Sequence, residues 1–293
     1  MPDALVQLST HVRRPRQWLW PGRIPLGCLT LVDGDPGVNK SILIYDIAAR
    51  VTQGRGMYGS DQAAAPGNVV LLQAEDTMDD MWDRLEAAGA DLDRVFVYGG
   101  TGDPIEFPRD IEWLEATIRE QQARFVVIDP AMSFITVNAN HYQAVQRALV
   151  PLAAMAQGTE AAVALVRHLN KSGGSNPLYR GSGSIGLIGA ARSGLLVAID
   201  PADPGRRVLA QTKTNLGTMS DSLSFRPVER GGGVAVEWLG TSVHSARRLL
   251  EAGGAQSQSE LEDAMYFLYA ILANGTLLLL EIARLAREDV NAG

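Results

Sequence analysis

Short apolar runs alternate with longer segments of helical spacing along the first part of the chain, a pattern typical of α/β proteins. Five runs are predicted to be strands: Leu29–Val32, Asn68–Ala74, Val95–Val97, Phe125–Asp129 and Ala161–Val166. Four segments are predicted to be helices: Ile42–Arg50, Asp79–Ala88, Glu112–Gln122 and Ala144–Gln157. Because helices separate most of these strands, we expect a mainly parallel central sheet flanked by helices.

The pattern changes to predicted hairpins farther along the chain. Four more runs are predicted to be strands: Ser193–Ala198, Val208–Lys213, Leu223–Pro227 and Val234–Leu239. The first two are joined by a Pro/Gly-rich turn at Asp200–Arg206, and the last two by Gly231–Gly233. Two short helices, Glu260–Ala273 and Leu279–Arg287, are expected near the C-terminus, where they resemble the start of a winged-helix module.

Changes in composition divide the chain into four parts. Residues 1–17 form a polar arm with Arg13, Arg14 and Arg16, either a simple terminal arm or a contact for a subunit or nucleic acid. Residues 18–240 form the main domain. Trp18 and Trp20 begin it, and they either pack against it or stack on an adenine. A polar, Gly-rich linker follows at 241–258, and residues 259–293 are a small helical appendage suited to packing or partner docking.

Composition narrows the function classes. The formal charge is 26 − 33 = −7, which argues against a polybasic coat on nucleic acid but allows a local basic loop or channel. Cys28 is the only cysteine, so neither an internal disulfide nor a cysteine-based metal site is expected, and a reducing compartment fits. The sequence shows no signal-peptide core and no apolar run near the roughly 20 residues that span a bilayer. A cytoplasmic protein without a membrane partner is therefore expected.

A glycine-rich stretch, Gly34–Ser41, reads Gly-Asp-Pro-Gly-Val-Asn-Lys-Ser between the first predicted strand and the first predicted helix. That context is typical of a phosphate-binding loop, where backbone N–H groups and the helix N-terminus face an anion. Lys40 is expected to contact the terminal phosphates of ATP, and the Ser41 hydroxyl to bind Mg²⁺. The residues expected around the phosphates are Gly34, Asp35, Pro36, Gly37, Val38, Asn39, Lys40, Ser41 and Ile42.

One position departs from the usual motif, which has glycine immediately before the lysine. Here that residue is Asn39. Asparagine is among the better non-glycine residues for unusual backbone angles, but its side chain could crowd the phosphates. We therefore expect nucleotide binding to survive, whereas Asn39 puts fast turnover in question.

Two predicted strands end in acidic residues. Glu75 follows the second strand and is a candidate to polarise the water that attacks the γ-phosphate. Alternatively, Glu75 or Asp76 caps the following helix, and Asp76 suits the cap better because it is nearer the helix. Asp129 ends a continuous apolar strand and is expected to hold hydrated Mg²⁺.

Polar residues beyond the fifth strand suggest two further roles. His168 either senses the γ-phosphate or is a satisfied core residue. The Gly/Ser-rich segment 172–185, with Lys171, Tyr179 and Arg180, is either a DNA-facing loop or an ordinary surface loop. Arg192 and Lys213 are candidates for a cation that completes a neighbouring subunit's site, and either could equally be a solvated surface charge.

Together these motifs resemble the RecA-like ATPases of the RepA type, which are hexameric replicative helicases, and their AAA-type relatives. The matching stretches are Trp18–Leu26, Gly34–Ser41, Gln73–Asp76, Val126–Pro130, Val166–Lys171, Tyr179–Ser184 and Lys213–Asn215. The resemblance implies a RecA-like core in a homo-oligomeric ring, ATP between subunits, and single-stranded DNA in the channel, contacted by the loop that contains Ser182 and Ser184. It also implies that Lys213 acts across the subunit boundary, as does the lysine of a short Lys-Asn-Arg motif in RadA proteins, although Asn215 replaces the arginine here.

The sequence thus predicts a Mg²⁺-dependent ATPase that moves along or remodels single-stranded DNA. The alternative is an ATP-binding switch or a replication or recombination accessory protein with weak turnover. A metabolic P-loop kinase is less favoured because the sequence shows no lid-like arginine cluster.

Overall fold

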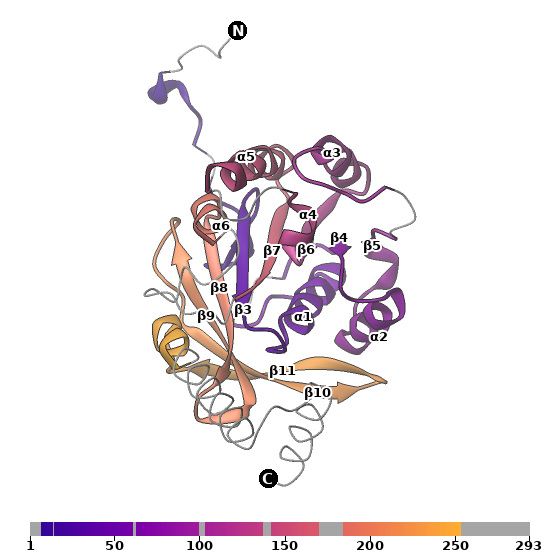
Figure 1. Cartoon of the computed structure of the whole chain (residues 1–293), viewed down its shortest axis with the longest axis vertical. Helices are drawn as coiled ribbons and strands as arrows, with labels where there is room; N and C mark the ends of the chain where they lie inside the picture. Colours follow the sequence, from indigo (N-terminus) through magenta and orange to yellow (C-terminus); the bar gives the residue numbers. More distant parts are fainter. Residues whose placement is uncertain are drawn as a thin grey trace, which may run out of the picture.

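A computed structural model describes residues 7–13, 15–60, 63–99, 103–136, 142–169 and 184–252 of this protein. Figure 1 shows a central sheet with helices on both of its faces. The two C-terminal helices and the candidate DNA-contacting residues Lys171, Tyr179, Arg180 and Ser182 lie outside the described residues. Ser184 is described only in its backbone.

Nine strands form the main sheet, in the order β11-β10-β9-β8-β3-β7-β6-β4-β5. Strands β8, β3, β7, β6, β4 and β5 run parallel, and β9 to β11 continue the sheet antiparallel. The bounds are β3 Leu29–Gly34, β4 Asn68–Gln73, β5 Val95–Val97, β6 Ala123–Asp129, β7 Ala162–His168, β8 Ser193–Asp200, β9 Asp203–Thr214, β10 Ser222–Arg230 and β11 Gly233–Ser242. A separate hairpin of β1 Trp18–Trp20 and β2 Ile24–Pro25 precedes the sheet.

The helices cover the sheet in two layers, with α1 and α2 on one side and α3, α5 and α6 on the other (Figure 1). Their bounds are α1 Lys40–Gln53, α2 Met78–Ala88, α3 Ile111–Glu120, α4 Ala131–Phe134, α5 Tyr142–Thr159 and α6 Ser184–Ala190, with 3-10 helices η1 Leu8–Thr10 and η2 Leu92–Arg94. None of the helices in the described ranges is long and apolar enough to cross a membrane.

The two layers follow from the two-residue period of a strand. In β4, Val69 and Leu71 pack with α1 and α2, whereas Val70 and Leu72 pack with α3 and α5. Both faces of the parallel strands are therefore apolar, which is why these strands read as continuous hydrophobic runs in the sequence.

The helix ends follow the expected local chemistry. Gly54 and Gly89 have the left-handed conformation that ends α1 and α2. Thr77 begins α2 in a capping box with Asp80, because each side chain accepts a hydrogen bond from the other residue's backbone N–H. Asp76 is not the N-cap, so the prediction that it suits this role is wrong.

The expected fold class is confirmed: the structure is a RecA-like α/β core with a mainly parallel central sheet. All the strands predicted from Leu29 to Leu239, and all four helices predicted in the first part of the chain, are present within a few residues of the expected bounds. Trp20 is buried against Trp238, which supports the packing interpretation of that residue.

Three segments differ from the prediction. Ser184 and Ile185, assigned to a loop, begin α6. The turn expected at Asp200–Arg206 is shorter, because Asp200 already pairs with Asp203, and the following residues lie in an irregularity of β9. Within the expected linker 241–258, residues 246–252 are helical, and the buried side chains of Ala246, Leu249 and Leu250 pack against β8 and β9.

Candidate functional site

The predicted phosphate-binding loop lies where the sheet topology reverses. It joins β3 to α1, and β3 lies between β7 and β8 at the centre of the sheet. Connections from neighbouring strands leave toward opposite faces at such a point, which creates the crevice where α/β proteins bind ligands. Glu75, Asp129 and His168 all lie at the same carboxyl edge, because they end or follow β4, β6 and β7.

The loop has the backbone shape of an anion-binding nest. Gly37 and Asn39 adopt left-handed conformations, with φ of 78° and 70°. Within the described residues, no protein group accepts a hydrogen bond from the backbone N–H of Gly37 or Val38. Free backbone N–H groups in a loop that contains left-handed residues and leads into a helix N-terminus are suited to bind phosphate oxygens. Gly34 is required for a different reason, since a Cβ there would collide with the carbonyl oxygen of Val197.

Lys40 is buried beneath this loop, with only 4% of its surface exposed. Its Nζ donates hydrogen bonds to the carbonyl oxygens of Gly34 and Asp35, both at 2.8 Å. Burial lowers the pKa of Lys40 to about 8, and the nearby carboxylates of Asp129, Asp35, Glu75 and Asp33 oppose this shift. The ammonium is thus held in place by acceptors that phosphate oxygens could replace.

A hydrogen-bonded chain connects Lys40 to Glu75 through His168. Lys40 Nζ lies 3.0 Å from His168 Nδ1, and His168 Nε2 lies 3.3 Å from a carboxylate oxygen of Glu75. A protonated lysine can only donate, so Nδ1 must accept and the ring proton must be on Nε2, facing Glu75. His168 therefore orients Glu75 and is in contact with the predicted phosphate-binding lysine.

Ser41 and Asp129 provide the oxygen atoms that a magnesium ion would need. Ser41 Oγ donates to Asp129 Oδ2 at 3.0 Å, and burial raises the pKa of Asp129. Mg²⁺ usually keeps several waters and takes only one or two protein oxygens beside phosphate, which fits this pair. The described residues include no cluster of three or more His, Cys, Asp or Glu side chains suited to a metal. The pair therefore fits a metal shared with phosphate rather than a closed protein cage.

Gln73 fixes the segment that carries Glu75, a role that the sequence analysis did not assign. Its Oε1 accepts hydrogen bonds from the backbone N–H groups of Ala74 and Glu75, at 2.9 and 3.2 Å. Its Nε2 faces Tyr45 Oη at 3.3 Å and Asp129 Oδ2 at 3.4 Å. The Glu75 side chain remains 54% exposed, so water can reach it.

Asp76 anchors the start of α2 to α1 instead of capping α2. It accepts hydrogen bonds from Tyr45 Oη at 2.7 Å and from Arg84 Nη1 at 2.6 Å. Burial raises the pKa of Tyr45, so its hydroxyl keeps its proton and donates. The two neighbouring acids thus differ in role: Asp76 is engaged in structure, whereas Glu75 faces His168.

A buried ion pair lies directly beneath the loop. Arg167 on β7 donates to both carboxylate oxygens of Asp33 on β3, at 2.7 and 2.8 Å. Burial raises the pKa of Asp33, and Arg167 offsets part of that shift. Asp33 precedes Gly34 and Arg167 precedes His168, so the pair fixes the two strands that carry the loop and the histidine.

Asn39 makes a contact that no local sequence pattern predicts. Its Oδ1 accepts a hydrogen bond from Arg207 Nε at 3.0 Å, across 168 positions of the sequence. The left-handed backbone that glycine would normally supply is therefore kept, and the side chain is held toward β9.

Arg192 and Lys213 lie away from the loop of their own chain. The register places Ser193 beside Thr30, and Lys213 beside Gly194, toward the amino end of β3. Lys213 Nζ donates to the carbonyl oxygens of Ile188 and Ala191 at the end of α6, and Arg192 is exposed. A contact of either residue with a neighbouring subunit stays a prediction.

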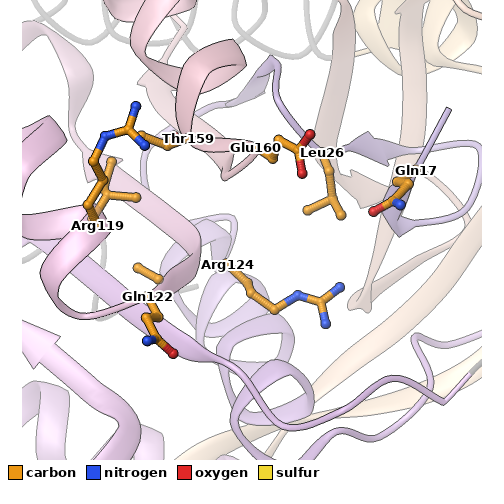
Figure 2. Close-up of a pocket in the computed structure, with 9 residues that line it drawn as sticks. Gln17, Leu26, Arg119, Gln122, Arg124, Thr159 and Glu160 are labelled. Carbon is orange, nitrogen blue, oxygen red and sulfur yellow. The ribbon is translucent and has the colours of Figure 1, made fainter. Parts of the chain in front are cut away.

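A separate cavity of about 530 Å³ lies at the opposite, amino-terminal edge of the strands. Figure 2 shows Arg124, Gln17, Glu160 and Leu26 around it. Arg119 at its border is already engaged by Glu115 and the carbonyl oxygen of Gly158. Because α/β sheets bind ligands outside the carboxyl ends of their strands, the loop edge is the better candidate for the nucleotide.

Curated relatives are about a quarter identical to this chain over the regions that align. A protein named DNA repair protein RadA from Halalkalibacterium halodurans is 25% identical over 171 residues, covering 57% of this chain and 33% of the relative. The protein of the same name from Mycobacterium tuberculosis is 27% identical over 158 residues, covering 52% of this chain and 29% of the relative. The chain thus spans about a third of the length of these relatives.

The AAA domain family matches residues 1–174, which include the loop, Glu75, Asp129 and His168. The match covers more than half of the 293-residue chain. With the parallel sheet and the loop geometry described above, it identifies the chain as a member of the AAA domain family with a RecA-like P-loop ATPase core.

Proposed function

We propose that the protein hydrolyses ATP in a Mg²⁺-dependent reaction at the loop 34–41 and couples this reaction to single-stranded DNA. The observation that carries the proposal is the convergence of two side-chain sets on one open loop. His168 at the end of β7 links Lys40, the first residue of α1, to Glu75, which follows β4. Ser41 on α1 is hydrogen-bonded to Asp129 at the end of β6.

Each residue has a distinct task in this proposal. The loop N–H groups and Lys40 bind the phosphates, and Ser41 with Asp129 would hold Mg²⁺, which neutralises phosphate charge when bound. Glu75 orients a water molecule and accepts its proton. The water oxygen then bonds to the γ-phosphorus, while the bond to the bridging oxygen breaks and ADP leaves with the electron pair.

We propose that His168 senses whether the γ-phosphate is present and that its response reaches Glu75. It contacts Lys40 through one ring nitrogen and Glu75 through the other, so a lysine drawn toward phosphate would release one side of the ring. A released ring can reorient, and Glu75 would then be free to face water.

The DNA part of the proposal rests on the family and on the relatives. The proteins named DNA repair protein RadA are similar to about half of this chain. The motifs of the sequence resemble those of helicases of the RepA type. We propose a homo-oligomeric ring, hexameric as in the RepA type, in which Arg192 or Lys213 completes a neighbour's site. Lys171, Tyr179, Arg180, Ser182 and Ser184 would contact single-stranded DNA.

A switch with weak turnover is the alternative, and Asn39 favours it. The residue replaces the glycine next to Lys40, and its half-exposed side chain lies beside the phosphate loop. Such a protein would bind ATP tightly and hydrolyse it slowly, whether or not DNA is present.

The test is the steady-state ATPase rate with and without a single-stranded oligonucleotide. We expect the wild-type rate to depend on Mg²⁺ and to rise with DNA, and Lys40→Ala to abolish hydrolysis. Arg119→Ala, at the opposite edge, is the matched control and should keep the wild-type rate. Full hydrolysis by Lys40→Ala would contradict the ATPase assignment, and tight ATP binding without DNA stimulation would favour the switch.

A further inference from the structure

Arg207 on β9 is a half-buried cation beside the phosphate loop. Its Nε donates to Asn39 Oδ1 at 3.0 Å, and its Nη1 donates to the carbonyl oxygens of Pro204 and Arg206 at 2.7 and 2.9 Å. No carboxylate in the part of the chain that the structure describes forms an ion pair with it. Its neighbour Arg206, in contrast, pairs with Asp203 at 2.8 Å.

Within the described ranges, no carboxylate therefore balances the charge of Arg207. Burial lowers the pKa of Arg207, and no nearby acid opposes that shift. A guanidinium that is partly removed from water is stabilised when an anion meets its remaining N–H groups, and Arg binds phosphate well through its planar donors. Through its contact with Asn39, the guanidinium lies beside the residue that precedes α1, and phosphate is expected at this helix N-terminus.

Asn39 provides a second donor at the same place. Arginine can only donate, so the amide oxygen of Asn39 must face Arg207, and its NH₂ group must point elsewhere. Asn39 does not cap its own helix through its side chain, although asparagine is a favoured N-cap residue. The described residues provide no acceptor for that NH₂ group, so it remains available to a ligand.

We propose that Arg207 and Asn39 of one chain form a second phosphate-binding element for the nucleotide in that chain's own loop. Arg207 provides a cation, and it orients the amide of Asn39 so that an N–H donor joins the loop amides. This inference rests on the proposed function, because it requires a nucleotide at residues 34–41. It gives a physical role to the replacement of glycine by Asn39: the backbone shape is kept and a donor is added.

The direct test is the affinity of the full chain for a fluorescent ATP analogue, with and without Mg²⁺, in Arg207→Met and Arg207→Lys. We expect Arg207→Met to weaken binding by about tenfold to hundredfold, as for loss of a hydrogen bond to a charged group, and Arg207→Lys to weaken it less. Arg206→Met is the matched control and should stay within about twofold of wild type, because its partner is Asp203. Wild-type affinity in Arg207→Met would overturn the inference.

A second variant tests the same inference if Arg207→Met does not fold. Asn39→Gly can keep the left-handed backbone, and it removes both the orienting contact and the extra donor. We expect Asn39→Gly to bind the analogue more weakly than wild type. In the double variant Arg207→Met/Asn39→Gly, the fold loss of affinity should not exceed the product of the two single losses. Unchanged or tighter binding in Asn39→Gly would contradict the proposed role of the amide.

Lys40→Ala distinguishes failure of this inference from failure of the proposed function. If Lys40→Ala loses binding while Arg207→Met and Asn39→Gly do not, only this inference fails. If Lys40→Ala also binds as wild type, the nucleotide does not occupy the loop and the proposed function itself fails.

Discussion

Lys40 is surrounded by four carboxylates from three segments of the chain, yet burial still lowers its pKa to about 8. The groups that face it are Asp129, Asp35, Glu75 and Asp33, together with the His168 ring. A lysine with such a pKa is charged at neutral pH and loses its charge in mildly alkaline solution. Its charge is the property on which the proposed phosphate binding depends.

The affinity for ATP should therefore fall above pH 8. Below this value Lys40 carries its proton and attracts phosphate; above it the neutral amine cannot, and affinity should decline by up to about tenfold per pH unit. Binding measured between pH 7 and 9.5 checks this, with Lys40→Ala as a weak but pH-independent control. Wild-type affinity that stays constant across this range would contradict the account.

Glu75 is the acid proposed to handle the proton of water. Glu75→Gln keeps the shape of the side chain and removes its ability to accept a proton, so turnover should fall by about 100- to 10,000-fold while ATP binding is retained. Rates and affinities measured on the same preparation would check both parts.

Asp79→Asn is a suitable control because Asp79 lies exposed in the first turn of α2. It should leave both quantities close to wild type. If Glu75→Gln hydrolyses ATP at the normal rate, another group must be the base.

Residue types at the ends of strands were predictable, whereas their partners were not. Lys40, Ser41, Asp129 and Glu75 could be selected because a strand, a glycine-rich turn and a helix have local signatures. The contact between Arg207 and Asn39 spans 168 positions, and that between Arg167 and Asp33 spans 134. Contacts of this kind depend on sheet register, and no local pattern announces them.

At the scale of elements, β3 and β8 approach so closely that the loop can begin only with glycine. A side chain at residue 34 would meet the carbonyl oxygen of Val197 and the side chain of Val38. The strand, the loop and the first turn of α1 are therefore fitted to one another.

Gly34→Ala should both destabilise the protein and weaken ATP binding. Overpacking at a rigid site costs about 1–3 kcal/mol, and the displaced loop would no longer align its N–H groups. Urea unfolding and nucleotide affinity measure the two effects. Gly217→Ala is the control, since an added Cβ there meets nothing within 4 Å. Equal stability of the two variants would show that β8 shifts to make room for the added methyl group, and would contradict the rigid fit described here.

The parallel core was predictable as a set of elements, but the antiparallel extension was less so. Buried parallel strands give continuous apolar runs, and Gly89 marks the end of α2. Pro204 and Gly205 indicated a long turn, yet they lie within β9, where the register shifts between Asp203 and Arg207. Residues 246–252 read as polar because only Ala246, Leu249 and Leu250 face the sheet.

In the molecule as a whole, the positions of Lys213 and Arg192 are consistent with the proposed site shared between subunits. Both lie toward the amino end of β3, whereas the loop of the same chain lies at its carboxyl end. In a ring of head-to-tail contacts, a residue remote from its own loop can reach the loop of a neighbour.

Mixing two inactive variants tests this arrangement. Glu75→Gln lacks the base but keeps Lys213, and Lys213→Ala keeps the base but lacks the cation. If the cation acts across the boundary, a random equal mixture should regain about a quarter of the wild-type rate, because one contact in four is complete. No recovery, in a mixture shown to exchange subunits, would mean that Lys213 does not act in a neighbour.

In the proposed function, the triphosphate of ATP binds the loop 34–41 with Glu75 and Asp129 facing it. A crystal structure with a non-hydrolysable ATP analogue and Mg²⁺ would show whether it does. We predict phosphates against the N–H groups of Gly37 and Val38, the Lys40 ammonium on the terminal phosphate, and the metal beside Ser41. Nucleotide bound in the cavity around Arg124, or phosphates excluded from the loop by the Asn39 side chain, would contradict it.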